Sequence, residues 1–242
     1  MIELRDVHKR LGARQILAGM TLSVPKGMNF VLMGPSGSGK SVTLKHVIGI
    51  LKPDSGSVQV DGQEVPAMDR SQLMTLRKRM GYLFQNGALI NWLTVFANVA
   101  LPLEEHARLP KGELDDRVHQ VLRLVGLDHA AAQFPPSISG GMKLRAGLAR
   151  ALVTNPEYVL YDEPNAGLDP IISRQIHELI ARVRDELNVT GLIVTHSKAC
   201  ATECGDRIGI LDNGKLGIEG SVDEMLRSDH PLARAFLRGG VD

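Results

Sequence analysis

Residues 34–41 form a glycine-rich segment that ends in a lysine and a hydroxyl residue. They are Gly34, Pro35, Ser36, Gly37, Ser38, Gly39, Lys40 and Ser41, which match the pattern G-x-x-x-x-G-K-[ST] in full. Glycines let backbone N–H groups converge on a polyphosphate, and the start of the following helix adds positive potential. Lys40 can then contact the β- and γ-phosphates, and the Ser41 hydroxyl can ligate Mg²⁺. An ordinary glycine-rich turn is the alternative, but the apolar strand before the segment and the helix after it favour nucleotide binding.

Two adjacent carboxylates, Asp162 and Glu163, follow four apolar or aromatic residues at 158–161. A buried parallel strand there delivers both to the carboxyl edge of a sheet, beside the phosphate loop. We expect Asp162 to hold Mg²⁺ and Glu163 to act as general base toward an attacking water. Taken alone, the pair could equally be a solvated acidic strand end; the phosphate loop favours the catalytic interpretation.

A second glycine segment, Ser139-Gly140-Gly141, precedes a predicted helix at about 141–153. It again places backbone donors and a serine at a helix N-terminus. In isolation, a helix N-cap with a glycine for packing explains it better. The phosphate loop already supplies the donors for the nucleotide that its own chain binds. The functional alternative is therefore that this second segment contacts the nucleotide bound by a second copy of the chain.

The elements that must position these residues follow from hydrophobic periodicity and turn signals. We expect antiparallel strands within 1–24, a strand–turn–strand unit at 57–65, and buried strands at 29–33, 81–84, 158–161, 191–195 and 207–211, with a further strand at 215–219. We expect helices at 41–51, 71–79, 111–125, 141–153, 171–187 and 197–204, and a last helix opened by a capping box at Ser221. This order predicts an α/β domain with a mostly parallel sheet and a helical insertion.

Composition excludes several functions. The 242 residues carry 28 basic and 27 acidic side chains, with a net charge of +1, and only 4% are aromatic. There is neither the basic field nor the stacking surface that a nucleic-acid-binding protein needs. Residues 80–103 carry no charge, but they include several amides, two glycines and a proline, so we do not expect a membrane-spanning helix.

Three further features have less specific explanations. Cys200 and Cys204 lie one turn apart on a predicted helix; metal binding is possible, but we expect reduced packing thiols, because a metal site would need a histidine or a third cysteine beside them. The basic run at 77–79 is explained better as a solvated helix end than as a lipid-headgroup contact. Trp92, the only tryptophan, fits either the core or a docking groove.

The order of the motifs resembles the ATP-binding cassette (ABC) transporter ATPases over roughly residues 2–237. The matching segments are the phosphate loop, Gln85, Ser139-Gly140-Gly141, Asp162-Glu163, Gly167-Leu168-Asp169 and His196. The resemblance implies a P-loop NTPase cassette: one domain over 1–242, with a RecA-like, mostly parallel sheet, an antiparallel β subdomain and a helical subdomain. The catalytic core would cover about 1–85 and 156–242, and the helical subdomain about 86–155.

The resemblance also implies a role for each motif, with ATP and Mg²⁺ as ligands. Gln85 would contact Mg²⁺ and sense a membrane partner, and His196 would contact the γ-phosphate. Ser139, Gly140, Gly141 and Asp169 would complete the site of the other protomer in a head-to-tail homodimer. Without the resemblance, a lone histidine after an apolar strand is more often structural.

A finer resemblance links the chain to the ATPases of Mla/MCE-type lipid transport systems. It rests on residues 84–89, 93–103, 66–68 and 76–80, and on Met142, where most ABC ATPases carry glutamine. It implies phospholipid transport between the inner and outer membranes and a peripheral location on the cytoplasmic face of the inner membrane. The implied partners are a permease whose coupling helix docks near residues 86–103, a small regulatory subunit and a periplasmic MCE-domain protein.

Two other functions remain open at this point. One is the ATPase of an importer for a polar solute such as an amino acid. The other is a non-transport ABC ATPase of DNA repair or translation, which usually fuses two cassettes or carries long insertions that this sequence lacks.

Three positions depart from the family pattern. Leu11 stands where an aromatic residue often stacks on adenine, so we expect loose discrimination between ATP and GTP. Ser197 replaces the aspartate that often follows the histidine of this motif, and residues 90–92 lack the phenylalanine-aspartate pair usual in the lipid-transport group.

Overall fold

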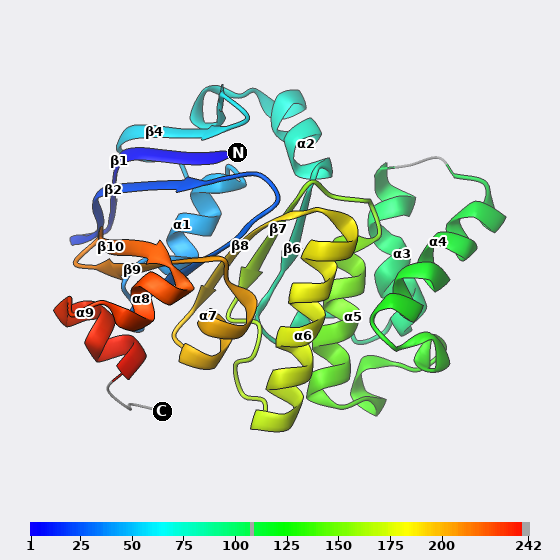
Figure 1. Ribbon diagram of the computed structural model, residues 1–242. Coiled ribbons are helices and arrows are strands. Elements are labelled where there is room, and N and C mark those ends of the chain that lie inside the picture. The colour runs from blue at the N-terminus through cyan, green and yellow to red at the C-terminus, as the bar shows by residue number, and fades with distance from the viewer. Residues whose placement is uncertain (107–108, 239–242) are drawn as a thin grey trace.

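The computed structural model describes residues 1–106 and 109–238, which form two β-sheets surrounded by helices (Figure 1). The antiparallel sheet has the order β2 (Arg14–Val24), β1 (Ile2–Leu11), β4 (Ser55–Val60) and β5 (Gln63–Glu64). The larger sheet has the order β10 (Lys215–Ser221), β9 (Arg207–Asp212), β3 (Asn29–Met33), β8 (Thr190–Thr195), β7 (Tyr158–Asp162) and β6 (Met80–Leu83). Its strands pair in parallel except β10, which is an antiparallel edge. The predicted mostly parallel sheet is confirmed.

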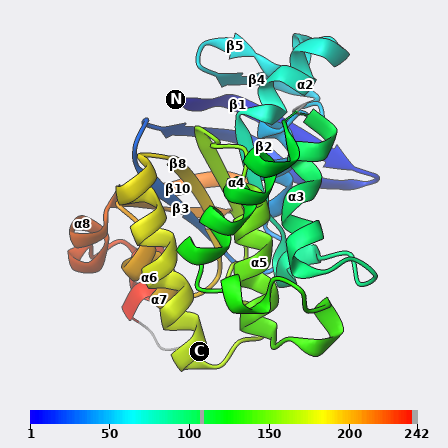
Figure 2. The same cartoon turned by 90° about the vertical axis from the view of Figure 1, so that its right-hand side faces the viewer.

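The helices are α1 (Lys40–Val47), α2 (Arg70–Lys78), α3 (Val95–His106), α4 (Lys111–Leu124), α5 (Gly140–Leu152), α6 (Pro170–Leu187), α7 (Lys198–Cys204), α8 (Val222–Arg227) and α9 (Pro231–Ala233). Short 3₁₀ turns occupy Val65–Ala67, Gln85–Ala88, Asp128–Ala130 and Pro135–Ser137, and a π-helical turn occupies Arg234–Arg238. Figure 2 shows α3, α4 and α5 side by side in one group of helices. They fall within the predicted subdomain at 86–155, whose boundaries stay a prediction. Residues 107–108 and 239–242 of the predicted ranges lie outside the described residues.

The core has two parts, one on each face of the larger sheet. Along β3, Phe30 and Leu32 pack toward the antiparallel sheet and α1, whereas Val31 and Met33 pack toward α5, α6 and α7. Side chains of a strand alternate between faces, so a strand covered on both sides must be apolar throughout. The run NFVLM satisfies this requirement, with only Asn29 polar, and places the following loop at the sheet edge.

One predicted helix is too long at its C-terminus. We expected residues 41–51 to be helical, but α1 ends at Val47. Gly49 adopts a left-handed backbone with φ of 66°, its N–H donates to the carbonyl of His46, and the N–H of Ile50 donates to that of Lys45. These bonds form a Schellman motif, in which glycine ends a helix because it has no Cβ to clash.

The uncharged residues 80–103 form β6, the turn at Gln85–Ala88 and most of α3. Among the described residues, no helix combines the length and the apolar character that a membrane crossing requires. Trp92 is 79% exposed, so the interpretation of this residue as core is wrong. The indole and the half-exposed Phe84 ring together present apolar surface on both sides of the turn.

The basic run at 77–79 is more structural than we expected. Arg77 donates to the carbonyls of Ile48 and Gly49, which lie just beyond the end of α1. Arg79 pairs with Asp61 and with Glu157. Arg77 and Lys78 are both exposed, as expected of a solvated helix end, whereas Arg79 is partly buried. By contrast, the predicted capping box is confirmed, because Ser221 and Glu224 exchange their hydrogen bonds at the start of α8.

Candidate nucleotide-binding site

Three neighbouring strands bring the predicted chemistry to one edge of the larger sheet. The phosphate loop follows β3, Asp162 ends β7 with Glu163 after it, and His196 follows β8. The strand registers align these three ends, because Met33 of β3 pairs with Thr195 of β8, and Asp162 of β7 pairs with Val194 of β8. The carboxyl edge of a parallel sheet is where α/β proteins bind ligands.

The phosphate loop holds a nearly buried cation. Lys40 is 7% exposed, and its Nζ donates to the carbonyls of Gly34 at 2.9 Å and Pro35 at 3.2 Å. Helix α1 begins at this lysine without a side-chain cap and without an acidic residue in its first turn. Its first N–H groups therefore keep donor capacity, which suits an anionic ligand. Behind the loop, the Ser38 hydroxyl is buried and has no hydrogen-bond partner in the described part of the chain.

A cavity of about 710 Å³ opens over this loop. Its lining residues are Arg14, Ile16, Ser36, Gly37, Gly39, Lys40, Ser41, Val42, Gln85, Asp162, Glu163, Ala166 and His196. The structure therefore brings together the loop, the glutamine, both carboxylates and the histidine that the sequence indicated. A cavity of this size suits a nucleotide.

Oxygen donors gather on one side of the cavity. The Ser41 hydroxyl donates to Asp162 Oδ1 at 2.8 Å, and the Tyr82 hydroxyl donates to Asp162 Oδ2 at 3.0 Å. Burial, and then the neighbouring Asp162 charge, raise the pKa of Tyr82 well above its usual range, so the phenol stays protonated and keeps donating. A carboxylate, a hydroxyl and the nearby Gln85 amide are the hard ligands that Mg²⁺ prefers, so these residues fit the metal.

Glu163 lies between two groups that position its carboxylate. Its Oε1 is 3.5 Å from Lys40 Nζ, and its Oε2 is 3.0 Å from His196 Nδ1. The side chain is only 15% exposed, while that of His196 is 66% exposed. Glu163 also has a left-handed backbone with φ of 48°, which is costly for a residue with a side chain and is found at functional sites.

Residues Ser139-Gly140-Gly141, which we call the signature segment, and Asp169 lie outside the cavity lining. The Ser139 hydroxyl accepts from the N–H of Met142 as the N-cap of α5, and Asp169 Oδ1 accepts from Ile171 and Ile172 as the N-cap of α6. A Cβ at Gly141 would lie 2.5 Å from Ile172, so this glycine lets α5 pack on α6. Within one chain, these contacts match the capping and packing interpretation; the role toward a second protomer stays a prediction.

The turn after Gln85 is packed directly on α5. Asn86 and Gly87 both have positive φ, at 61° and 75°. A Cβ at Gly87 would collide with the carbonyl of Lys143, and one at Gly147 would lie 2.7 Å from Gly87 Cα. Arg150 donates to the carbonyls of Gly87 and Ala88. The turn at Gln85–Ala88 and helix α5 are therefore packed tightly against each other.

Sequence reasoning missed two residues of the site, Tyr82 and Arg14. Tyr82 holds Asp162, and the signal was a phenol within the predicted strand at 81–84. Arg14 lines the cavity mouth and donates to the Gly37 carbonyl at 3.3 Å, but no motif marks it. Leu11, by contrast, is 44% exposed and is not among the lining residues.

Comparisons with known proteins agree with this geometry. The sequence profile of the family described as "ABC transporter" matches residues 17–166. A "Probable ribonucleotide transport ATP-binding protein mkl" of Mycobacterium leprae is 42% identical over 98% of this chain and 69% of its own length. The "Intermembrane phospholipid transport system ATP-binding protein MlaF" of Escherichia coli is 40% identical over 100% of this chain and 90% of its own length.

Comparison with solved structures also finds ABC ATPase cassettes with a similar fold. The dimeric structure of a post-hydrolysis state of the ATP-binding cassette MJ0796, bound to ADP and Pi, superposes with a TM-score of 0.83. That chain is 32% identical in sequence, and the match covers 92% of this chain and 99% of that one.

Proposed function

The chain belongs to the ABC transporter family, and on that premise we propose that it powers a transporter of phospholipid between the inner and outer membranes. Its fold is the ABC ATPase cassette, and it binds and hydrolyses ATP. The observation that carries the lipid assignment is the 40% identity, over the whole chain, to a protein named for intermembrane phospholipid transport. We place the chain at the cytoplasmic face of the inner membrane, as a peripheral subunit.

The phosphate loop binds the triphosphate of ATP in this proposal. Lys40 exchanges its bonds to the loop carbonyls for phosphate oxygens, and the free N–H groups at the start of α1 add further donors. Nearly complete burial strengthens each of these charged contacts, because little water screens them.

Asp162, Ser41 and Gln85 would hold Mg²⁺, which neutralises charge on the phosphates when bound. Asp162 is already oriented for this role, since Tyr82 and Ser41 each donate to one of its oxygens. The Tyr82 bond leaves the carboxylate little freedom to turn away from the cavity.

Glu163 orients and deprotonates the attacking water, and His196 contacts the γ-phosphate. Before nucleotide binds, Glu163 is engaged by both Lys40 and His196. Phosphate binding draws Lys40 away and frees one carboxylate oxygen for water. The base becomes available only when its substrate is in place.

Two chains would complete each site. Ser139, Gly140, Gly141 and Asp169 lie outside the cavity of their own chain, and the similar cassette bound to ADP and Pi is dimeric. We therefore propose a head-to-tail homodimer in which these residues contact the nucleotide of the partner protomer.

The permease would dock at residues 86–103. Trp92 in this segment and Phe84 just before it expose apolar surface, and none of the exposed residues from 84 to 92 is charged. Such a surface, apolar with amide hydrogen-bonding groups, is typical of protein interfaces. The tight packing of Gly87 on α5 would connect this docking surface to the signature segment. A small regulatory subunit and a periplasmic MCE-domain protein complete the proposed complex.

The lipid assignment is tested by purifying the native complex from detergent and identifying its subunits and bound small molecules together. We expect an integral membrane subunit and phospholipid above the level of a mock purification. Trp92→Glu should weaken association with the membrane subunit, whereas Ile50→Glu, at an exposed apolar residue elsewhere, should not. A complex that retains a water-soluble solute and no excess lipid would contradict the assignment.

That contrary outcome would favour a second candidate, a transporter of polar solutes. The 42% identity to a mycobacterial protein named for ribonucleotide transport is the observation in its favour. The match covers 69% of that relative, so its name carries less weight than the near full-length match to the phospholipid system.

We expect similar kcat/KM values for ATP and GTP, within about tenfold, which corresponds to about 1.4 kcal/mol. The reason is that Leu11 offers no aromatic face for the base and does not line the cavity. Steady-state hydrolysis of both nucleotides measures this. A strong preference for ATP would show that another side chain contacts the base; Arg14, at the cavity mouth, would then be the first to test.

A further inference from the structure

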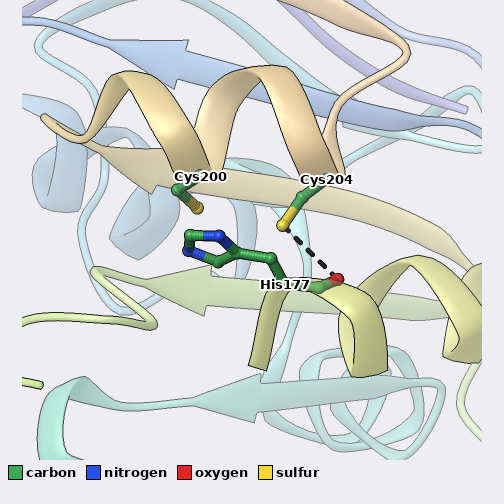
Figure 3. A group of neighbouring side chains, drawn as sticks. All are labelled: His177, Cys200 and Cys204. Carbon is green, nitrogen blue, oxygen red and sulfur yellow. Dashed lines mark hydrogen bonds between the residues drawn. The ribbon is translucent and has the colours of Figure 1, made fainter. Parts of the chain in front are cut away.

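Three buried side chains with metal-binding atoms meet between α6 and α7. His177 from α6 faces Cys200 and Cys204 from α7 (Figure 3). A ring nitrogen of His177 and the two sulfurs all lie within 4.8 Å of one another, and none of the three residues is more than 1% exposed. The sequence argument against a metal site is therefore wrong in its premise, because a histidine from another helix lies beside the cysteines.

The His177 ring has one nitrogen held by a carboxylate and one without a partner among the described residues. Its Nδ1 bonds Glu203 Oε2 at 2.8 Å, which leaves Nε2 as the second ring nitrogen. Nε2 is buried, and no described residue gives it a hydrogen bond. Metal-binding histidines commonly have one nitrogen held by a carboxylate, which orients the ring and makes the other nitrogen a better ligand.

We propose that His177, Cys200 and Cys204 bind one Zn²⁺ ion in each chain. Two sulfurs and one imidazole are a donor set that zinc favours over Mg²⁺ or Ca²⁺. Two thiolates balance the charge of the divalent ion, so the complex is neutral and can be buried at small cost. Binding releases the two thiol protons to solvent, including the one that Cys204 now donates to the His177 carbonyl at 3.7 Å.

The geometry needs only a small adjustment. With Zn–S of about 2.3 Å and Zn–N of about 2.0–2.1 Å, a tetrahedral site places its donor atoms about 3.3–3.8 Å apart. The three donors must therefore approach one another by at most about 1.5 Å from their separation of up to 4.8 Å. Rotation of the cysteine side chains and a slight approach of α7 to α6 supply this.

The ion has a route to the site. A surface groove of about 620 Å³ is lined by His177 and Glu203, together with Ser173 of α6 and Ala199 of α7. Glu203 is 42% exposed and connects the solvent to the buried ring. The remaining zinc ligand is a water from this groove.

Bound zinc would join two helices that start at loops of the nucleotide site. Helix α6 begins directly after Asp169, and α7 begins two residues after His196. We therefore expect added Zn²⁺ to raise the melting temperature of the protein, because it binds only when α6 and α7 are packed together.

The test uses the purified full-length chain, stripped of metal under reducing conditions and titrated with Co²⁺ as a spectroscopic substitute for zinc. We expect one equivalent to give tetrahedral visible bands and a thiolate-to-cobalt charge-transfer band, both abolished by added Zn²⁺. The nucleotide site holds only oxygen and nitrogen ligands, so it produces no such band. Absence of the charge-transfer band from folded protein would overturn the proposal, whatever the transported substrate.

Variants assign the ligands. Cys200→Ala with Cys204→Ala should remove the charge-transfer band, and both changes keep the site apolar. Glu203→Gln should weaken binding by about 10–100-fold while keeping the band. His46→Gln is the matched control: His46 is also buried with an unpartnered Nε2, but it lies on α1, and its change should leave cobalt binding unaltered. A band that persists without the cysteines would refute the assignment.

X-ray absorption at the zinc edge of the unmodified protein gives an answer that does not depend on how variants fold. We expect two sulfur neighbours and at least one imidazole nitrogen. A shell of oxygen and nitrogen alone would place the zinc elsewhere and overturn the proposal.

Discussion

Glu163→Gln should reduce ATP turnover by about 10²–10⁴-fold, the usual contribution of a general base, while ATP binding is retained. The amide has the shape of the carboxylate but cannot accept the proton of the attacking water. It also removes a negative charge close to the position of the γ-phosphate, so ATP should bind more tightly. We therefore expect the ATP-bound dimer to accumulate, which light scattering with and without nucleotide measures directly.

Glu178→Gln is the matched control for this experiment. Glu178 is an exposed carboxylate on α6 whose ion pair is with Arg174, one turn earlier, and exposed pairs of this kind contribute little to stability. The ATP turnover of the Glu178→Gln variant should equal that of the unaltered chain. If Glu163→Gln hydrolyses ATP at the original rate, Glu163 is not the base, and the bond between Glu163 and His196 serves only to orient the histidine.

Lys40→Ala should weaken ATP binding by at least about 30-fold, the lower end of the roughly 2–5 kcal/mol lost when one partner of a buried charge pair is truncated. The Nζ group is buried at the phosphate loop, and the shorter side chain reaches neither the loop carbonyls nor a phosphate. Isothermal titration or a fluorescent nucleotide measures the change in Kd.

The control lies on the same helix. Lys45→Ala removes an equal charge from the exposed side of α1, so it should leave the Kd for ATP nearly unchanged at moderate salt. Unaltered ATP binding by Lys40→Ala, in protein with normal circular dichroism, would contradict the assignment of residues 34–41 to the phosphates.

The features that the sequence predicted well depend on short-range signals. The phosphate loop, the Asp162-Glu163 pair and the capping box at Ser221 are each contained within a few residues, where backbone chemistry decides the conformation. The ends of elements were less certain. Gly49 could have been recognised as the end of α1, since glycine is common directly after a helix, but the apolar spacing continued to Leu51 and favoured a longer helix.

Contacts between distant segments could not be derived from one sequence. Tyr82 and Asp162 are 80 residues apart, and His177 lies 23 residues before Cys200 in the chain. Each pair meets only because strands or helices pack side by side, and hydrophobic periodicity fixes which face of an element is buried but not which polar groups meet there. The cysteines were assigned as simple packing residues for this reason.

The exposure of Trp92 has an optical consequence. It is the only tryptophan in the chain and is 79% exposed, so the indole fluorescence of the whole protein originates from one solvated point on its surface. A protein surface that covers this ring removes water from it and shifts its emission to shorter wavelength. The unlabelled cassette therefore carries its own sensor for whatever binds beside Gln85, and its spectrum can follow that binding in real time while ATP is added.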